Sequence, residues 1–162
     1  MNDLWIIDGH NVIHASRELK ALLAQDSTGS TAQRTLFDQA RLLADFANHA
    51  LLIVFDSRHV KTFSEKWQER QQRSGIEVCY GSADTQADTL IEQRVVSDSG
   101  KRRIYVVTED NAILHVVQAA GCFSVSIKEF ESRIETLEKQ QARVVKRKNT
   151  QADNDFKNGL PL

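Results

Sequence analysis

Short apolar runs recur along the chain, and each ends at a polar residue. Runs of this length that are rich in β-branched and aromatic residues, and apolar on both faces, are typical of buried parallel strands. Three such strands are predicted at 4–7, 51–55 and 104–107. The alternating segment 76–80 predicts a further strand nearer the sheet edge, and 122–125 predicts a weaker fifth.

Apolar residues at helical spacing fill the intervals between these runs. They predict helices over about 12–23, 36–47, 87–95, 113–120 and 127–137. Strands that alternate with helices imply crossover connections. The pattern therefore predicts an α/β fold, a Rossmann-like three-layer αβα arrangement around a mostly parallel central sheet.

The composition limits the possible partners. The 162 residues suit one domain with a single core. The 21 Lys and Arg nearly balance 22 Asp and Glu, which excludes a strongly basic nucleic-acid binder, so any contact with a polyanion must come from a local patch. No apolar run approaches the roughly 20 residues that span a bilayer. We therefore expect a cytoplasmic protein without a membrane partner.

The composition changes near residue 140, where apolar residues become rare. We expect a folded domain over 1–140 and a polar, basic, flexible tail over 141–162. Basic residues between Arg143 and Lys148 could contact phosphates, or the tail could simply be solvated.

Acidic residues follow the predicted buried strands. Asp8 and Asp56 each end one, and Glu109 and Asp110 follow another. The carboxyl ends of parallel strands lie on one side of a sheet, where ligands bind. Asp88 falls in the first turn of a predicted helix that opens on the same side. Glu92 is one turn further on and shares its face.

Converging carboxylates need a counter-charge. Two of them about 4 Å apart repel by roughly 4 kcal/mol at an effective dielectric of 20. Oxygen-only ligands suit Mg²⁺ or Mn²⁺, which can activate water and stabilise a phosphoryl displacement. The alternative is that each aspartate caps a helix or closes a turn. Asn11 could cap the next helix or fix the Asp8 carboxylate through its side-chain amide.

The histidines show no metal-ligand spacing. His10, in the loop after the first strand, is expected to pack or hydrogen-bond rather than carry protons. The other four are expected to be structural or solvated; they are His14, His49, His59 and His115.

A basic segment after Asp56 offers a path for an RNA backbone. Aromatic residues are interleaved in it and could stack unpaired bases. Alternatively, Glu65 and Glu69 pair with the basic residues, and Trp67 packs on the sheet. The candidate RNA-binding residues are Arg58, Lys61, Lys66, Trp67, Arg70 and Arg73.

Five segments in this order resemble the YacP-like branch of the NYN domains, in the PIN-like nuclease superfamily. They are 8–13, 54–56, 75–78, 87–92 and 106–110. The resemblance covers about residues 3 to 135 and implies a PIN/NYN-like fold. It also implies a metal-dependent endoribonuclease that cleaves single-stranded RNA. One branch of the family cuts messenger RNA in a ribosome-dependent way, so the ribosome is a possible partner.

The resemblance also implies the site residues. The catalytic set is Asp8, Asp56, Asp88, Asp110 and Asn11. The ligands expected to hold Mg²⁺ or Mn²⁺ are Asp8, Asp88, Asp110 and Glu92. Two positions depart from the family: His10 replaces the usual Tyr, and Glu109 replaces a common Ser.

Two other functions are compatible with the sequence. One is a non-catalytic module with this fold that binds RNA or the ribosome. The other is a phospho-acceptor domain modified on Asp56. Such domains place a lysine at the end of a late strand, and neither Lys101 nor Lys128 falls there.

Overall fold

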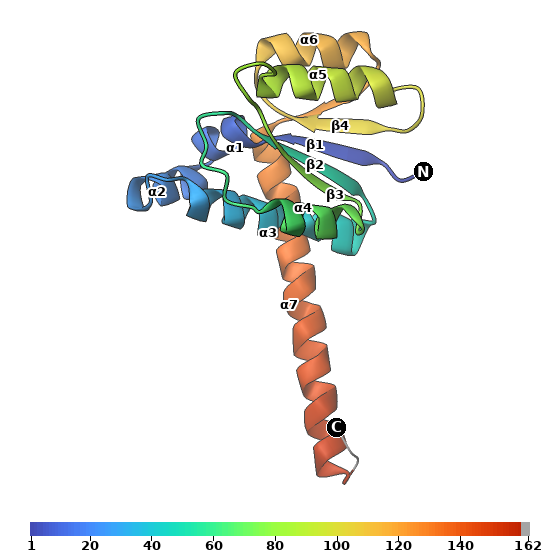
Figure 1. Cartoon of the computed structure of the whole chain (residues 1–162). Helices are drawn as coiled ribbons and strands as arrows, with labels where there is room; N and C mark the ends of the chain where they lie inside the picture. The colour runs from blue at the N-terminus through green and yellow to red at the C-terminus, as the bar shows by residue number, and fades with distance from the viewer. Residues whose placement is uncertain (160–162) are drawn as a thin grey trace.

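The chain forms a five-stranded sheet with helices on both faces (Figure 1). This computed structural model describes residues 1–159. The strands are β1 (Leu4–Asp8), β2 (Ala50–Phe55), β3 (Ile76–Tyr80), β4 (Ile104–Val107) and β5 (Phe123–Val125). The helices are α1 (Gly9–Ala15), α2 (Arg17–Gln25), α3 (Ser30–Ala47), α4 (Glu65–Gln72), α5 (Ala87–Asp98), α6 (Asn111–Ala119) and α7 (Ile127–Lys157).

The sheet order is β3-β2-β1-β4-β5, and every neighbouring pair is parallel. The predicted α/β fold with a parallel sheet is therefore confirmed. From β1 the chain moves outward through β2 and β3, then returns to β4 on the other side of β1. The strand order thus switches direction between β1 and β4. Ligands of such sheets bind at this switch point, outside the carboxyl ends of the strands.

Two apolar layers fill the two faces of the sheet. Trp5 and Ile7 of β1 point into one core, which also contains apolar residues of α1, α3 and α7. Leu4 and Ile6 point into the other, beneath α5 and α6. Figure 1 shows α5 and α6 on one side of the sheet and α3 on the other. Because β1 is covered on both faces and paired on both edges, its carboxyl end is poorly accessible to water.

The prediction of one continuous helix over about 12–23 is wrong, because the structure has two helices there, α1 and α2. Ser16 lies between them in an extended conformation. Its hydroxyl accepts a hydrogen bond from the backbone N–H of Leu19 at 3.3 Å, which caps α2. A serine that caps a new helix competes with continuation of the preceding one.

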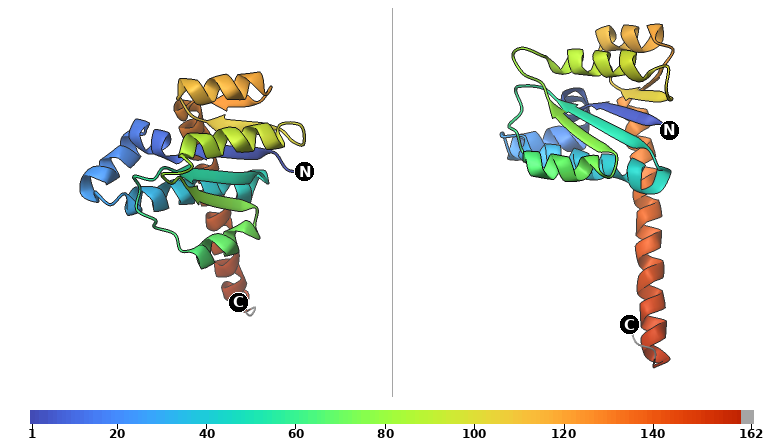
Figure 2. Two further views of the ribbon diagram at one scale, coloured as in Figure 1. Left: turned by 45° about the horizontal axis from the view of Figure 1, so that its top comes forward. Right: turned by 45° about the vertical axis from the view of Figure 1, so that its right-hand side comes forward.

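The last helix continues through the region where a tail was predicted. Leu137 is the last buried residue of α7, and the remaining turns project away from the sheet (Figure 2). The expected boundary at 140 therefore falls within a continuous helix, just beyond its last core contact. The division into a domain and a flexible tail stays a prediction. Within residues 1–159, no helix is both long and apolar enough to span a bilayer.

Gly9 lets β1 pass directly into α1 without a loop. A Cβ atom at this position would lie 2.6 Å from Cδ1 of the buried Phe55 ring and 2.9 Å from the carbonyl oxygen of Val54. Any larger side chain would therefore push β1 and β2 apart. This close approach holds Asp8 at the edge where the strands end.

Candidate active site

Asp8 is a buried carboxylate at the end of the central strand. Its side chain accepts a hydrogen bond from the Thr108 hydroxyl at 2.9 Å and from the backbone N–H of Asn11 at 3.4 Å. Burial raises the pKa of Asp8 to about 6, although these two hydrogen bonds act in the opposite direction. The charges of Asp88 and Asp110 raise the pKa further. Within residues 1–159, no basic side chain pairs with Asp8.

Thr108 links Asp8 to the loop that follows β4. Its hydroxyl donates to Asp8 and accepts a hydrogen bond from the backbone N–H of Asp110 at 3.1 Å. Sequence reasoning missed this residue, and its signal was weak: a hydroxyl group between a buried strand and an aspartate. Asn11 takes neither of its predicted side-chain roles, because its Oδ1 accepts from the backbone N–H of Glu109 at 2.8 Å. Both contacts fasten the β4 loop to the end of β1.

Asp110 is the N-cap of α6. Its Oδ1 accepts hydrogen bonds from the backbone N–H groups of Ala112 and Ile113, at 2.9 and 3.2 Å. The alternative prediction, that an aspartate after a strand caps a helix or closes a turn, is confirmed at this position. It is also confirmed at Asp8, the N-cap of α1, and at Asp56, whose Oδ1 accepts from the backbone N–H of Arg58. At Asp110, capping uses only Oδ1, and Oδ2 has no hydrogen-bond partner in the described part of the chain.

Asp88 lies in the first turn of α5, next to the same edge of the sheet. The Asp88 side chain is exposed, but partial desolvation still raises its pKa. The charges of Asp110 and Asp56 add to this effect, and the charge of Arg58 opposes it. Asp8, Asp88 and Asp110, here called the acidic centre, thus interact electrostatically from three different elements. Glu92 is half-buried one turn further along α5, and its role as a ligand stays a prediction.

Asp56 has a directly bonded counter-charge, which no member of the acidic centre has within residues 1–159. Its Oδ2 lies 2.6 Å from Nη2 and 3.1 Å from Nε of Arg58, and 3.1 Å from Nδ1 of His10. Burial would raise the pKa of Asp56, but the hydrogen bonds from Arg58 outweigh burial and lower it. Asp56 is therefore neutralised locally, which agrees with its absence from the expected metal ligands. Its catalytic role stays a prediction.

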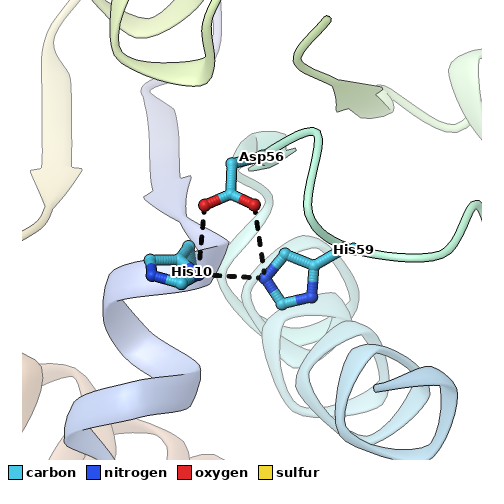
Figure 3. Close-up of side chains that lie close together, drawn as sticks. All are labelled: His10, Asp56 and His59. Atoms are coloured by element: carbon cyan, nitrogen blue, oxygen red, sulfur yellow. Dashed lines mark hydrogen bonds and ion pairs between the residues drawn. The ribbon is translucent and has the colours of Figure 1, made fainter. Parts of the chain in front are cut away.

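Two histidines that are 49 residues apart in the sequence, His10 and His59, lie next to Asp56 (Figure 3). His10 Nδ1 lies 3.2 Å from His59 Nε2, and the His59 side chain is only 6% exposed. Burial lowers the pKa of His10 to about 4 and also lowers that of His59, so both rings are neutral near pH 7. These three residues are here called the His–Asp cluster. Sequence reasoning missed it because only the pairing of β1 with β2 brings residues 10 and 59 together.

The compactness of the two groups differs. Among the residues that the structure describes, the His–Asp cluster is the only set of three His, Cys, Asp or Glu residues whose potential ligand atoms all lie within 4.8 Å of one another. The acidic centre is more widely spaced. Its carboxylates could bind an ion that keeps several of its waters, as Mg²⁺ usually does.

The predicted RNA-binding residues fall into two groups. The exposed basic residues are Arg58, Lys61, Lys66, Arg70 and Arg73. Trp67 instead stacks on Phe63, with ring centroids 4.2 Å apart, and packs edge-on against Phe37. Trp67 therefore packs against the core, as the alternative expected, but its ring contacts are with Phe63 and with Phe37 of α3. The alternative also predicted ion pairs between these basic residues and Glu65 or Glu69, and no such pair forms within residues 1–159.

Comparison with known families agrees with the resemblance noted in the sequence. The family model of the YacP-like NYN domain matches residues 5–161, which is nearly the whole chain. The chain belongs to the YacP-like NYN domain family. NYN domains are part of the PIN-like nuclease family, so nucleic acid is the implied class of substrate and a metal ion the suggested cofactor.

Similar proteins support this membership. The YacP protein of Bacillus subtilis is 25% identical over 146 residues, which cover 90% of this chain and 82% of that protein. The crystal structure of Rae1 (YacP) from the same organism shares the fold, with a TM-score of 0.78 at 23% identity over 97% of this chain and 88% of that one. A point mutant of Rae1 gives a TM-score of 0.73 at 22% identity, over 91% and 84% of the two chains.

The raised pKa of Asp8 predicts that its charge destabilises this NYN domain. Between about pH 4 and pH 6 the folded state binds the Asp8 proton more tightly than the unfolded chain, so the free energy of unfolding falls as the pH rises. In metal-free buffer, Asp8→Asn should therefore raise the free energy of unfolding by about 1–3 kcal/mol at pH 7. Urea denaturation measures this difference.

The gain should shrink as the pH falls through 4 and disappear near pH 3, where Asp8 is mostly protonated in both the folded and the unfolded state. Asp38→Asn, which changes an exposed aspartate of α3, is the matched control and should have little effect at either pH. An Asp8→Asn variant that is less stable than the wild type by the same amount at both pH values would contradict the argument.

Proposed function

We propose that this NYN domain is a divalent-metal-dependent endoribonuclease that cleaves single-stranded RNA. The observation that carries the proposal is Asp8, a desolvated carboxylate beside Asp88 and Asp110 that has no cationic partner within residues 1–159. Such an arrangement is electrostatically unfavourable unless a cation joins it. Strongly perturbed carboxylates at a ligand-binding edge of a sheet are typical of functional sites.

The oxygen donors of the acidic centre fit Mg²⁺ or Mn²⁺. Asp88 has no hydrogen bond from its side chain in the described region, and Asp110 keeps Oδ2 free while Oδ1 caps α6. Asp8, Asp88 and Asp110 would hold the ion, with Glu92 as a further ligand. When bound, the ion would activate a water molecule and stabilise negative charge on the phosphate.

The surrounding residues orient these carboxylates. Thr108 fixes one oxygen of Asp8 through its hydroxyl, and its own position is fixed by the backbone of Asp110. Asn11 holds the loop at Glu109 against the start of α1. This network keeps the end of β1 and the β4 loop in one geometry, as a site that must position a phosphodiester requires.

A cavity beside the acidic centre could admit the RNA backbone. It has a volume of about 410 Å³, and its lining includes Asp56, Arg58, Ser82, Gln86 and Asp88. Arg58, in the loop after β2, is one of its lining residues. Arg58 is therefore a candidate to bind the phosphate next to the one that is cleaved, and Asp56 would keep Arg58 in place.

The exposed basic residues of the α4 region extend this path. Lys61 precedes α4, Lys66 and Arg70 lie on it, and Arg73 follows it. Their charges are free to contact phosphates, since no ion pair within the described residues neutralises them. The resemblance also predicts that the protein could cleave RNA on the ribosome, and this stays a prediction.

Purified protein with Mn²⁺ should cleave an unstructured RNA oligonucleotide, and EDTA should stop the reaction. Asp8→Asn and Asp88→Asn should each lower the rate by at least about 100-fold, because even the outer-shell partners of metal ligands commonly change activity by 10–100-fold. The control is Asp38→Asn, which should cleave at the wild-type rate. Products are followed on denaturing gels.

Two results would contradict the proposal. Equal cleavage by Asp8→Asn and the wild type would indicate a contaminating nuclease. RNA binding that is insensitive to EDTA, without cleavage under any divalent metal or on translating ribosomes, would favour the non-catalytic binding module instead.

The basic path predicts a salt effect on RNA binding. The double variant Lys66→Gln with Arg70→Gln should weaken binding of a labelled single-stranded RNA and lower the slope of log affinity against log salt by about 1.4, since each phosphate contact contributes about 0.7 on single strands. Fluorescence polarisation in EDTA measures binding without cleavage. Lys101→Gln, at an exposed lysine before β4, is the control. An unchanged slope in the double variant would remove α4 from the interface.

A further inference from the structure

The His–Asp cluster has the geometry of a set of metal ligands. His10 Nδ1 lies 3.1 Å from Asp56 Oδ2 and 3.2 Å from His59 Nε2. An ion about 2.1 Å from each of two such donors would hold them roughly 3.0–3.4 Å apart at ligand angles near 90–110°. The third separation, from His59 Nε2 to Asp56 Oδ1, is 4.0 Å, so a small shift of the carboxylate would complete the site.

The hydrogen bonds leave one ring nitrogen with its lone pair directed into the cluster. Arg58 Nη2 lies 2.9 Å from His10 Nε2, and a guanidinium can only donate. The proton of the neutral His10 ring is therefore on Nδ1, from which it points to Asp56. His59 Nε2 faces the same N–H and must be an acceptor. Such a nitrogen is suited to coordinate a cation.

The backbone holds the three side chains in place. His10 is in the first turn of α1, and Asp56 follows β2, the neighbour of β1 in the sheet. The backbone N–H of His59 donates to the carbonyl oxygen of Asp56 at 3.1 Å, which fixes the turn between them. The His59 ring packs against the ring of the buried Phe55, with centroids 5.7 Å apart. Little rearrangement of the backbone is needed for all three to face one ion.

The His–Asp cluster borders a different cavity from the one beside the acidic centre. A cavity of about 360 Å³ is lined by His10, Arg58, His59 and residues of the turn before α3. The cavity beside the acidic centre has Asp56, Arg58 and Asp88 in its wall, but neither histidine. Arg58 thus stands between the two spaces. An ion at the His–Asp cluster would be separated from one at the acidic centre.

We propose that His10, Asp56 and His59 form a second metal site, which binds a divalent transition-metal ion of the Zn²⁺ class through two imidazole nitrogens and one carboxylate oxygen. Imidazole ligands favour Zn²⁺ and its first-row neighbours, whereas Mg²⁺ prefers oxygen ligands. The proposal does not depend on nuclease activity. Three protein ligands leave at least one coordination position open to water or substrate.

The ion would replace Arg58 as the counter-charge of Asp56. The Arg58 side chain is 72% exposed, so it can leave the carboxylate without disturbing the core. For His10 Nδ1 to coordinate the ion, its proton would move to Nε2, the nitrogen that Arg58 Nη2 leaves. Metal binding would thus release a guanidinium at the rim of the acidic cavity. The occupancy of this second site would determine whether Arg58 pairs with Asp56 or is free for another anion.

The test is a titration of the full-length protein with Zn²⁺, observed through the nitrogen resonances of the histidine rings. We expect shifts at Nδ1 of His10 and Nε2 of His59 that saturate at one ion per chain. His49 and His115 should not respond. Zn²⁺-dependent shifts confined to other histidines, or no shifts, would overturn the proposal.

Affinities from competition with a chromogenic chelator give the second measurement. His59→Ala should weaken Zn²⁺ binding by at least about tenfold, and His10→Gln, at a ring that is 28% exposed, gives the same test with less risk to folding. The matched control is His14→Gln, because His14 lines the same cavity but lies outside the three-residue cluster. Equal affinity in His10→Gln and the wild type would overturn the assignment.

Two further variants separate this site from the acidic centre. Arg58→Gln should bind Zn²⁺ more tightly than the wild type, because a competing cation has been removed, and weaker binding would contradict the proposed exchange. Asp88→Asn should bind Zn²⁺ as the wild type does, even if it loses cleavage. A large loss of Zn²⁺ affinity in Asp88→Asn would place the ion in the acidic centre and overturn the proposal.

Discussion

The burial of a negative charge at the end of the central strand is the constraint on which this site depends. Asp8 is 5% exposed, and within residues 1–159 it has only a hydroxyl and a backbone N–H to stabilise its charge. A shift of its pKa from 3.8 to about 6 corresponds to about 3 kcal/mol against the ionised form at neutral pH. The two cores on either side of β1 stabilise the fold against this cost. A cation at the acidic centre would remove it.

A second aspartate, Asp56, lies at the same edge of the sheet, and its pKa is lowered rather than raised. Asp56 ends the neighbouring strand, and Arg58 and His10 stabilise its charge directly. The two aspartates thus differ in their counter-charge rather than in their place in the fold. Arg58 bonds to Asp56 and lines two cavities, one with His10 and His59 and the other with Asp88. The protein therefore has one buried aspartate without a cationic partner within residues 1–159 and one with its own counter-charge.

The strands and the side of the sheet that carries the site could be predicted from the sequence. The apolar runs that end at Asp8, Asp56 and Thr108 are long enough for buried parallel strands, and parallel strands bring their carboxyl ends together. The strand ends and the start of α5 also predicted that Asp8, Asp56, Asp88 and Asp110 gather at this edge, and the family resemblance assigned their roles. Local patterns also missed the break at Ser16, where a helix-capping hydroxyl interrupts an otherwise regular apolar stripe.

The contacts that define the chemistry could not be predicted, because they join distant residues. Thr108 reaches Asp8 only because β4 pairs with β1, and His59 reaches His10 only because β2 does. Strand order is a property of the whole chain that no local window contains. The length of α7 was missed for a different reason: beyond Leu137 the helix has no buried face, so it shows no apolar periodicity.

The central claim is that burial destabilises the charged form of Asp8 and that a bound divalent ion would stabilise that charge. The most direct measurement is the pH titration of the Asp8 side-chain carboxyl carbon by NMR, with and without Mg²⁺. The account predicts a pKa near 6 in metal-free buffer and a fall of that pKa when Mg²⁺ is added. A pKa near the ordinary value of 3.8 that Mg²⁺ leaves unchanged would contradict it.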